Sequence, residues 1–86
     1  MAQAGVRVRF FAALREAAGE DEIVTASGSL QALLAELRAR YGEPFSTRLS
    51  LASVLLDGTA VPRSADVPVE DGVEVALLPP VSGGGR

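Results

Sequence analysis

Cysteine, histidine, lysine and tryptophan are all missing from the 86-residue sequence. Without cysteine or histidine the chain cannot form the usual zinc sites, use a thiol nucleophile or build a Ser-His-Asp triad. Without lysine it lacks a Schiff-base amine and the phosphate-binding lysine of a P-loop. No disulfide is possible, which leaves the redox compartment open. Carboxylates, hydroxyls, arginines and the chain termini are the groups left for chemistry.

Charge and hydropathy exclude two further kinds of partner. Eight arginines against eleven acids give a net charge of −3, and the arginines are not gathered into a stripe, so nucleic acid is not expected. No apolar run approaches the roughly 18 residues of a membrane span, and no leader pattern is present. We therefore expect a cytoplasmic protein without a membrane partner.

The length predicts one domain over residues 1–86. Within it we expect a frayed N-terminus at 1–5, a folded core at 6–78 and a flexible tail at 79–86. Strand and helix patterns together predict an α+β fold, in which one main helix packs across one face of a four- or five-stranded sheet.

The first half of the chain carries two strand patterns. Val6, Val8 and Phe10 alternate with polar or outward residues, as in a strand with one buried face. Residues 12–19 favour a turn of helix or a structured loop, and 22–26 have the β-branched content of a second strand.

The clearest element is a helix from Leu30 to Tyr41. Ser29 is suited to the N-cap, Gly42 to the residue after the C-cap, and Pro44 prevents continuation. The apolar residues follow helical spacing and form one stripe: Leu30, Leu33, Leu34, Leu37 and Tyr41.

The second half predicts a hairpin and a last strand. Residues 44–52 and 62–68 are expected to be surface connections or loops. Between them, 53–61 is typical of a hairpin with a type I′ turn at Asp57-Gly58. Residues 73–78 form the last predicted strand, whose inward residues are Val73, Val75 and Leu77.

Charged residues offer weak candidates for a site. The acids at 20–22 and 70–71 are candidate metal ligands, but both groups lie at predicted turns, where solvated acids are common. Arginines on the outward faces of the first strand and the main helix are expected to cover surface with their stems, or to contact an anionic partner; they are Arg7, Arg9, Arg38 and Arg40.

Two outward apolar residues are more informative. Strand alternation points both Phe11 and Leu78 away from the core, near the ends of the first and last strands. If these strands are neighbours, the two side chains, with Val81, form an apolar patch of the kind that marks an interface.

The tail is rich in glycine. Such a segment is ordinarily a disordered end. However, glycine has no Cβ, so a diglycine can pass through a narrow channel, and its carboxylate is sterically open. A chain without catalytic side chains could therefore be the substrate of a partner's chemistry at this end.

Both ends of the sequence resemble one known family. Residues 8–19 (VRFFAALREAAG) and 71–84 (DGVEVALLPPVSGG) resemble the small subunit of molybdopterin synthase, the MoaD family of ubiquitin-like sulfur carriers. The helix and the Asp57-Gly58 hairpin fit as well, so the similarity spans about residues 6–84. It implies a ubiquitin-like β-grasp fold with a flexible C-terminal diglycine tail.

The resemblance also implies a role and its partners. An E1-like enzyme uses ATP to adenylate the terminal glycine, and a sulfur donor protein converts it to a thiocarboxylate. The large synthase subunit, expected in a heterotetramer of two small and two large subunits, then transfers the sulfur to cyclic pyranopterin monophosphate. The small subunit is not an enzyme on its own, and it is expected to hold no metal or permanent cofactor.

By resemblance, Gly84 is the activated residue and Gly83 precedes it. The arm that leads to them is then formed by Pro79, Pro80, Val81 and Ser82. The apolar docking patch is formed by Phe11, Ala60 and Leu78. The family ends at the second glycine, whereas this sequence continues through Gly85 and Arg86. We expect either that a protease trims these residues or that they are foreign to the natural chain.

Three alternatives stay open at this point. A carrier for thiamin, cysteine or a secondary metabolite would share the fold and the diglycine. A ubiquitin-like protein modifier is also compatible, although a chain without lysine cannot form isopeptide-linked polymers of itself. The third is an interaction module with an inert tail.

Overall fold

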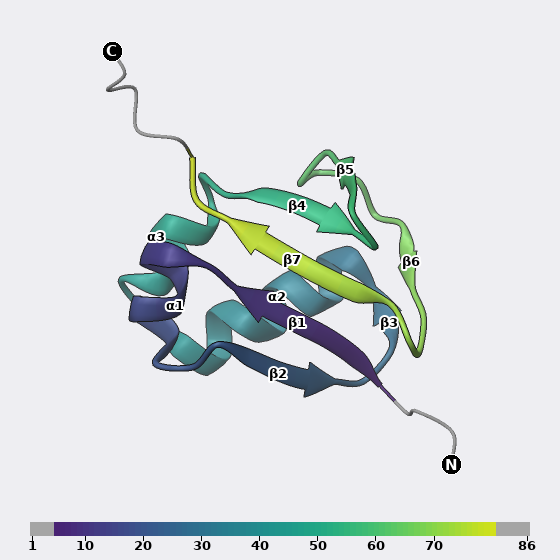
Figure 1. Cartoon of the computed structure of the whole chain (residues 1–86), viewed down its shortest axis with the longest axis horizontal. Coiled ribbons are helices and arrows are strands. Elements are labelled where there is room, and N and C mark those ends of the chain that lie inside the picture. The colour runs from purple at the N-terminus through teal and green to yellow at the C-terminus, as the bar shows by residue number, and fades with distance from the viewer. Residues whose placement is uncertain (1–4, 81–86) are drawn as a thin grey trace.

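The computed structural model describes residues 5–80, whose strands form a five-stranded sheet and a small two-stranded one (Figure 1). The helices are α1 (Ala12–Ala18), α2 (Leu30–Tyr41) and α3 (Phe45–Leu49). The strands are β1 (Val6–Phe10), β2 (Glu22–Thr25), β3 (Gly28–Ser29), β4 (Ser53–Leu56), β5 (Thr59–Val61), β6 (Pro68–Val69) and β7 (Glu74–Leu78). The predicted α+β arrangement is confirmed.

The large sheet has the order β2-β1-β7-β4-β5, so the first and last strands of the chain lie side by side at its centre (Figure 1). They run parallel, with Phe10 opposite Leu77, and the other pairs in this sheet are antiparallel. The neighbouring strands that the apolar patch required are therefore present.

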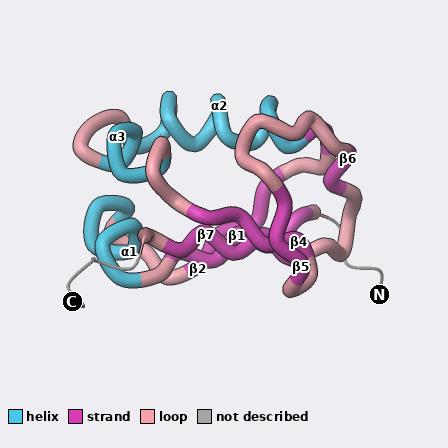
Figure 2. Tube along the Cα trace, turned by 90° about the horizontal axis from the view of Figure 1, so that it is seen from above, coloured by secondary structure: helices cyan, strands magenta, loops and turns pink. Residues whose placement is uncertain are grey.

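Helix α2 lies across one face of the large sheet (Figure 2). Its four leucines, Leu30, Leu33, Leu34 and Leu37, are buried and pack with the inward residues of the strands. The Ser29 hydroxyl accepts a hydrogen bond from the Ala32 amide at 3.1 Å, which satisfies one of the free N–H groups of the first turn and confirms the predicted N-cap.

The segment 44–52, predicted to be a surface connection, is instead part of the core. It contains α3, and Phe45, Leu49 and Ala52 are fully buried. The Phe45 ring lies 5.6 Å from the ring of Phe10 and 4.8 Å from that of Tyr41, between centroids. A five-residue helix is too short for a periodic signal, and its burial depends on aromatic residues from β1 and α2.

Other differences from the predicted elements are smaller. The predicted turn or loop at 12–19 is helix α1, which ends at Ala18 with Gly19 as its C-cap, and β7 begins at Glu74 rather than Val73. Within the predicted loop 62–68, Pro68 starts a short strand that pairs with β3. The type I′ turn is confirmed, since Asp57 and Gly58 both have positive φ, at 49° and 84°.

Candidate functional site

The candidate site is the end of the sheet from which the tail leaves. Strand β7 ends at Leu78, and Pro79 and Pro80 follow (Figure 1). Neither proline has an amide hydrogen, so neither can donate a further hydrogen bond to β1 or β4. The sequence thereby ends the pairing of a central strand and directs the chain off the sheet.

Phe11 lies beside the base of the tail, directly after the parallel partner of Leu77. It is the N-cap residue of α1 rather than a strand residue, and its side chain is half-buried. The Arg9 guanidinium lies 5.2 Å from the centre of its ring, on the face of the sheet opposite the core. Ala12 then turns the chain into α1 with a φ of 50°.

A row of apolar residues extends from the region of Phe11 across the same face of the sheet. Ala76 on β7 pairs with Leu55 on β4, and Leu55 pairs with Ala60 on β5. These residues alternate with core residues such as Val75 and Leu77, so they face away from α2. We call the set the outer apolar surface. It consists of the exposed Ala60, the half-buried Phe11, Leu55 and Leu78, and Ala76, which is buried between its neighbours.

The structure thus places Phe11, Ala60 and Leu78 on the same face of one sheet. Phe11 and Leu78 share its tail end, and Ala60 lies on the edge strand, separated from them by Leu55 and Ala76. The sequence interpretation missed Leu55 and Ala76, although the same alternation that identified Leu78 points both outward. The other predicted site residues, Val81, Ser82, Gly83, Gly84, Gly85 and Arg86, lie outside the described residues.

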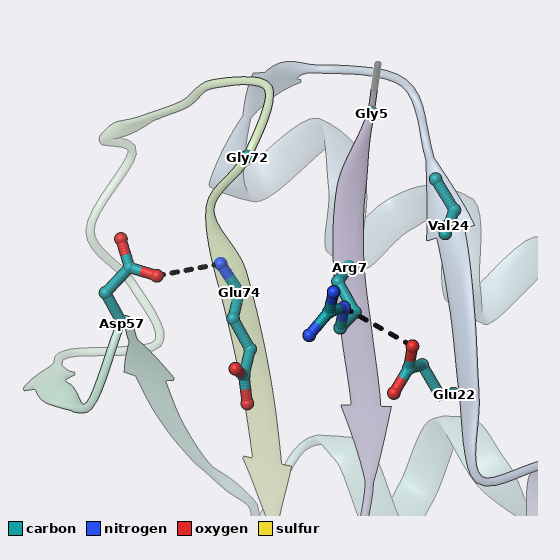
Figure 3. A pocket seen from close by; sticks show the side chains of 7 residues that line it. All are labelled: Gly5, Arg7, Glu22, Val24, Asp57, Gly72 and Glu74. Atoms are coloured by element: carbon teal, nitrogen blue, oxygen red, sulfur yellow. Dashed lines mark hydrogen bonds and ion pairs between the residues drawn. The ribbon is translucent and has the colours of Figure 1, made fainter. Parts of the chain in front are cut away.

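The opposite end of the same face is charged (Figure 3). Arg7 lies 3.3 Å from Glu22, and Arg9 lies 3.2 Å from Glu74, between nitrogen and oxygen. These side chains are about half exposed, so each pair contributes at most about 1 kcal/mol. Three of these side chains, Arg7, Glu22 and Glu74, line an open polar pocket of about 230 Å³ together with Gly5, Val24, Asp57 and Gly72.

This pocket does not carry catalytic chemistry of its own. Its one arginine, Arg7, is paired with the Glu22 carboxylate, and the Asp57 side chain accepts a hydrogen bond from the Glu74 amide at 2.9 Å. The Gly5 carbonyl accepts another from the Gly72 amide at 2.9 Å, which joins the start of β1 to the turn before β7. The polar groups are therefore occupied in holding the strands.

The acids at 20–22 are dispersed among different cations rather than gathered around one point. Glu20 accepts a hydrogen bond from the Tyr41 hydroxyl at 2.7 Å, Asp21 faces Arg15, and Glu22 lies near Arg7. Within residues 5–80, no three acids converge in a way that could hold a metal ion.

The hydroxyl of Tyr41 has a raised pKa. Burial, together with the hydrogen bond to Glu20 and its negative charge, raises this pKa from the ordinary 10 to about 12. The ring packs against Phe10 and Phe45 on the helix side of the sheet. A phenol with a pKa of about 12 stays protonated at neutral pH, so this group stabilises the fold rather than supplying an acid or base at the tail.

None of the helices within residues 5–80 has the length and apolar character needed to cross a membrane.

A comparison with family models matches residues 8–84 to the ThiS family. No curated protein matched the chain. The solved structures that it resembles include the solution structure of the Haloferax volcanii HVO 2177 protein, at 28% identity, with a TM-score of 0.74 and coverage of 96% of this chain and 89% of that one.

Two further similar structures differ in what their names describe. SAMP1 from Haloferax volcanii is 26% identical, with a TM-score of 0.74, over 94% of this chain and 100% of that one. A protein in a complex of subunits 1 and 2 of molybdopterin-converting factor from Helicobacter pylori is 29% identical, with a TM-score of 0.68, over 92% and 97% of the two chains. The described architecture matches the ubiquitin-like β-grasp fold of these proteins.

Proposed function

The chain belongs to the ThiS family, and from that premise we propose that it is a sulfur carrier, the small subunit of molybdopterin synthase. The observation that carries this proposal is the joint position of the outer apolar surface and the tail. Phe11 and Leu78 flank the point where the chain leaves the sheet toward PVSGG. A partner that docks there receives the C-terminal glycines in the same event.

The proposed chemistry takes place on the carboxylate of Gly84. An E1-like enzyme joins this carboxylate to the AMP part of ATP and releases pyrophosphate. A sulfur donor protein then supplies the sulfur that displaces AMP, which leaves a thiocarboxylate. In the large subunit the sulfur passes to cyclic pyranopterin monophosphate, and water restores the carboxylate. Two such transfers form the dithiolene.

In this proposal the described residues bind and position rather than catalyse. Pro79 and Pro80 lack amide hydrogens, so they cannot extend the pairing of β7 beyond Leu78. Gly83 and Gly84 have no Cβ, so they pass through a channel too narrow for other residues. The general acid and base groups belong to the large subunit, since this chain has neither histidine nor lysine.

The structure of molybdopterin-converting factor subunits 1 and 2 supports a large-subunit partner, because one chain in it is similar to this one over nearly its full length. The sequence PPVSGG and the Phe10-Phe11 start support the molybdopterin pathway over carriers for thiamin, cysteine or secondary metabolites. We propose that Gly85 and Arg86 are removed before activation, because the Arg86 side chain would have to pass through the same channel.

A second candidate function is a protein modifier. This candidate is supported by the similarity to SAMP1. Two other similar structures give the full name of SAMP1, small archaeal modifier protein 1. In that case the activated Gly84 would be joined to an amine of a target protein. The lack of lysine in this chain permits single attachment but not polymers linked through its own lysines.

A transfer assay separates the two. The thiocarboxylated chain ending at Gly84 is mixed with the large subunit from the same genome and cyclic pyranopterin monophosphate, and molybdopterin is measured. The proposal predicts product only with the thiocarboxylate, and loss of product with Phe11→Arg. Absence of product with a competent large subunit, together with covalent adducts on cellular proteins, would establish the modifier instead.

A further inference from the structure

Leu51 is an exposed apolar residue that the proposed docking surface does not yet include. Of the residues described, only Leu51 and Val24 are large apolar side chains with high exposure, 61% in each case. Single exposed apolar residues are common on proteins. The two differ in their position relative to the tail, however: Leu51 precedes β4, which pairs with β7, whereas Val24 lies on the edge strand β2.

Leu51 lies beside the base of the tail, on the side opposite Phe11. Ser53 at the start of β4 pairs with Leu78 at the end of β7, so the loop that holds Leu51 joins the sheet next to the last residue of β7. On the other side of β7, Phe11 follows the pair formed by Phe10 and Leu77. A protein that takes up the tail therefore meets apolar side chains on both sides of it.

Leu51 is also held in place before any partner arrives. Its amide donates to the Arg48 carbonyl at 3.1 Å, and the amide of the next residue, Ala52, donates to the Leu49 carbonyl at 3.1 Å. Leu49 and Ala52 are fully buried. The exposed side chain is thus anchored near two core residues, which reduces the entropy that a partner must remove on binding.

Two arginines are linked to the loop of Leu51: the Arg48 carbonyl accepts the hydrogen bond from the Leu51 amide, and the Arg63 side chain contacts the next residue, Ala52. The Arg48 guanidinium donates to the Ala13 carbonyl at 3.2 Å, and that of Arg63 donates to the carbonyl of Ala52. Neither has an acidic partner among residues 5–80, in contrast to Arg7, Arg9, Arg15 and Arg40. The loop of Leu51 therefore has one exposed apolar side chain and is linked to two arginines that have no acidic partner among the described residues.

We propose that Leu51, with Arg48 and Arg63, is a second docking point for the large subunit, whose facing surface is an apolar recess bordered by carboxylates. This inference rests on the proposed function and adds a contact outside the outer apolar surface. The occupant is the protein that receives the tail, because the loop of Leu51 and the base of the tail lie side by side. Because Arg48 and Arg63 are cations, the complementary groups on the facing surface of the partner are carboxylates.

The test measures the Kd of the full chain for the large subunit from the same genome. Leu51→Glu should raise Kd by about tenfold or more, as for a central contact residue. Leu51→Lys should raise it less, because a cation suits an acidic border. Val24→Glu is the matched control, since Val24 is equally exposed but lies on edge strand β2, which is separated from β7 by β1; it should stay within about twofold.

The outcomes separate this inference from the proposed function. If the wild-type chain binds and Phe11→Arg weakens it while Leu51→Glu does not, the second docking point is wrong and the proposed function stands. If Leu51→Lys weakens binding as much as Leu51→Glu, the acidic border is wrong. If Leu51→Glu impairs only adenylation by the E1-like enzyme, the occupant is that enzyme. If the wild-type chain does not bind the large subunit, the proposed function itself fails.

Discussion

The two faces of the central sheet differ in what covers them. On the face under α2, residues such as Val8, Val54 and Leu77 are fully buried. On the opposite face no described helix lies across the strands (Figure 2). The side chains there form the outer apolar surface and the ion pairs around Arg7 and Arg9. Because successive strand residues alternate between these faces, one short chain keeps stability and recognition on separate sets of residues.

The outer face is itself divided along the strands. Near the tail it has the apolar residues Phe11 and Leu78, with Arg9 over the Phe11 ring. Near the start of β7 it carries Arg7 and Glu74, and Glu22 reaches Arg7 from the middle of the sheet. Charges that are already paired contribute little to the binding of a partner. An apolar surface loses its water on docking, which makes the free energy of binding more favourable. We therefore expect recognition to concentrate at the end where the tail emerges, and the following changes test that division.

The largest effect is expected on the covered face, at Phe45. Phe45→Ala should lower the free energy of unfolding by about 3–5 kcal/mol, because it removes a fully buried ring from contact with Phe10 and Tyr41. Urea unfolding followed by far-UV circular dichroism measures this. Ser46→Ala, on the same helix, is the control and should change it by at most about 0.5 kcal/mol. A loss below about 1 kcal/mol for Phe45→Ala would contradict the core position of α3.

On the open face, Ala60→Arg should act on binding rather than stability. Ala60 is exposed, so the free energy of unfolding should stay within about 0.5 kcal/mol, while the Kd for the large subunit rises by about tenfold. Thr59→Arg is the control, since Thr59 lies on the same strand but pairs with Leu56, which packs on the core side. Equal losses from both variants would show that the two faces do not differ in recognition.

A pH effect is expected from the helix side of the sheet. The pKa of Tyr41 is about 12 in the folded protein and ordinarily 10. The folded state thus holds this proton more tightly, and its stabilising effect is complete below pH 10 and is lost as the pH rises toward 12. Tm should fall across this range by more in the wild type than in Tyr41→Phe. A tyrosinate absorbance titration with its midpoint at the ordinary value would contradict the shift.

The smallest effect is expected at the turn into α1, beside Phe11. Ala12 has a φ of 50°, which glycine adopts without the steric cost that alanine bears. Ala12→Gly should therefore raise the free energy of unfolding, by less than about 1 kcal/mol. Ala13→Gly, at the next helical position, should lower it by about as much. If both variants destabilise the protein equally, the left-handed turn at Ala12 is wrong.

Local patterns predicted the elements that depend on nearby residues. The leucine spacing of α2, the Ser29 cap and the Asp57-Gly58 turn each express a short-range requirement, and all three are present. Helix α3 could not be predicted in this way. Its five residues lack a periodic pattern, and Phe45 is buried by rings that come from β1 and α2.

The candidate site also depends on contacts between residues distant in the sequence, which local patterns do not predict. Alternation alone indicated that Leu78 faces outward, but the contact between the two ends of the chain depends on the parallel pairing of β1 with β7, which no local pattern encodes. Leu51 was missed because its position beside the tail follows from the register of β4 against β7. The roles of Gly83 and Gly84 came from resemblance, and they stay predictions.

The measurement that tests the central claim most directly is the intact mass of the chain ending at Gly84 after incubation with ATP, an E1-like activating enzyme and a sulfide source. The account predicts a gain equal to the replacement of one oxygen by sulfur, absent without ATP and strongly reduced in Gly84→Ala, which keeps the fold. The full chain through Arg86 should not gain this mass. No gain on the Gly84 form, in a reaction where the same enzyme thiocarboxylates its own known carrier, would contradict the account.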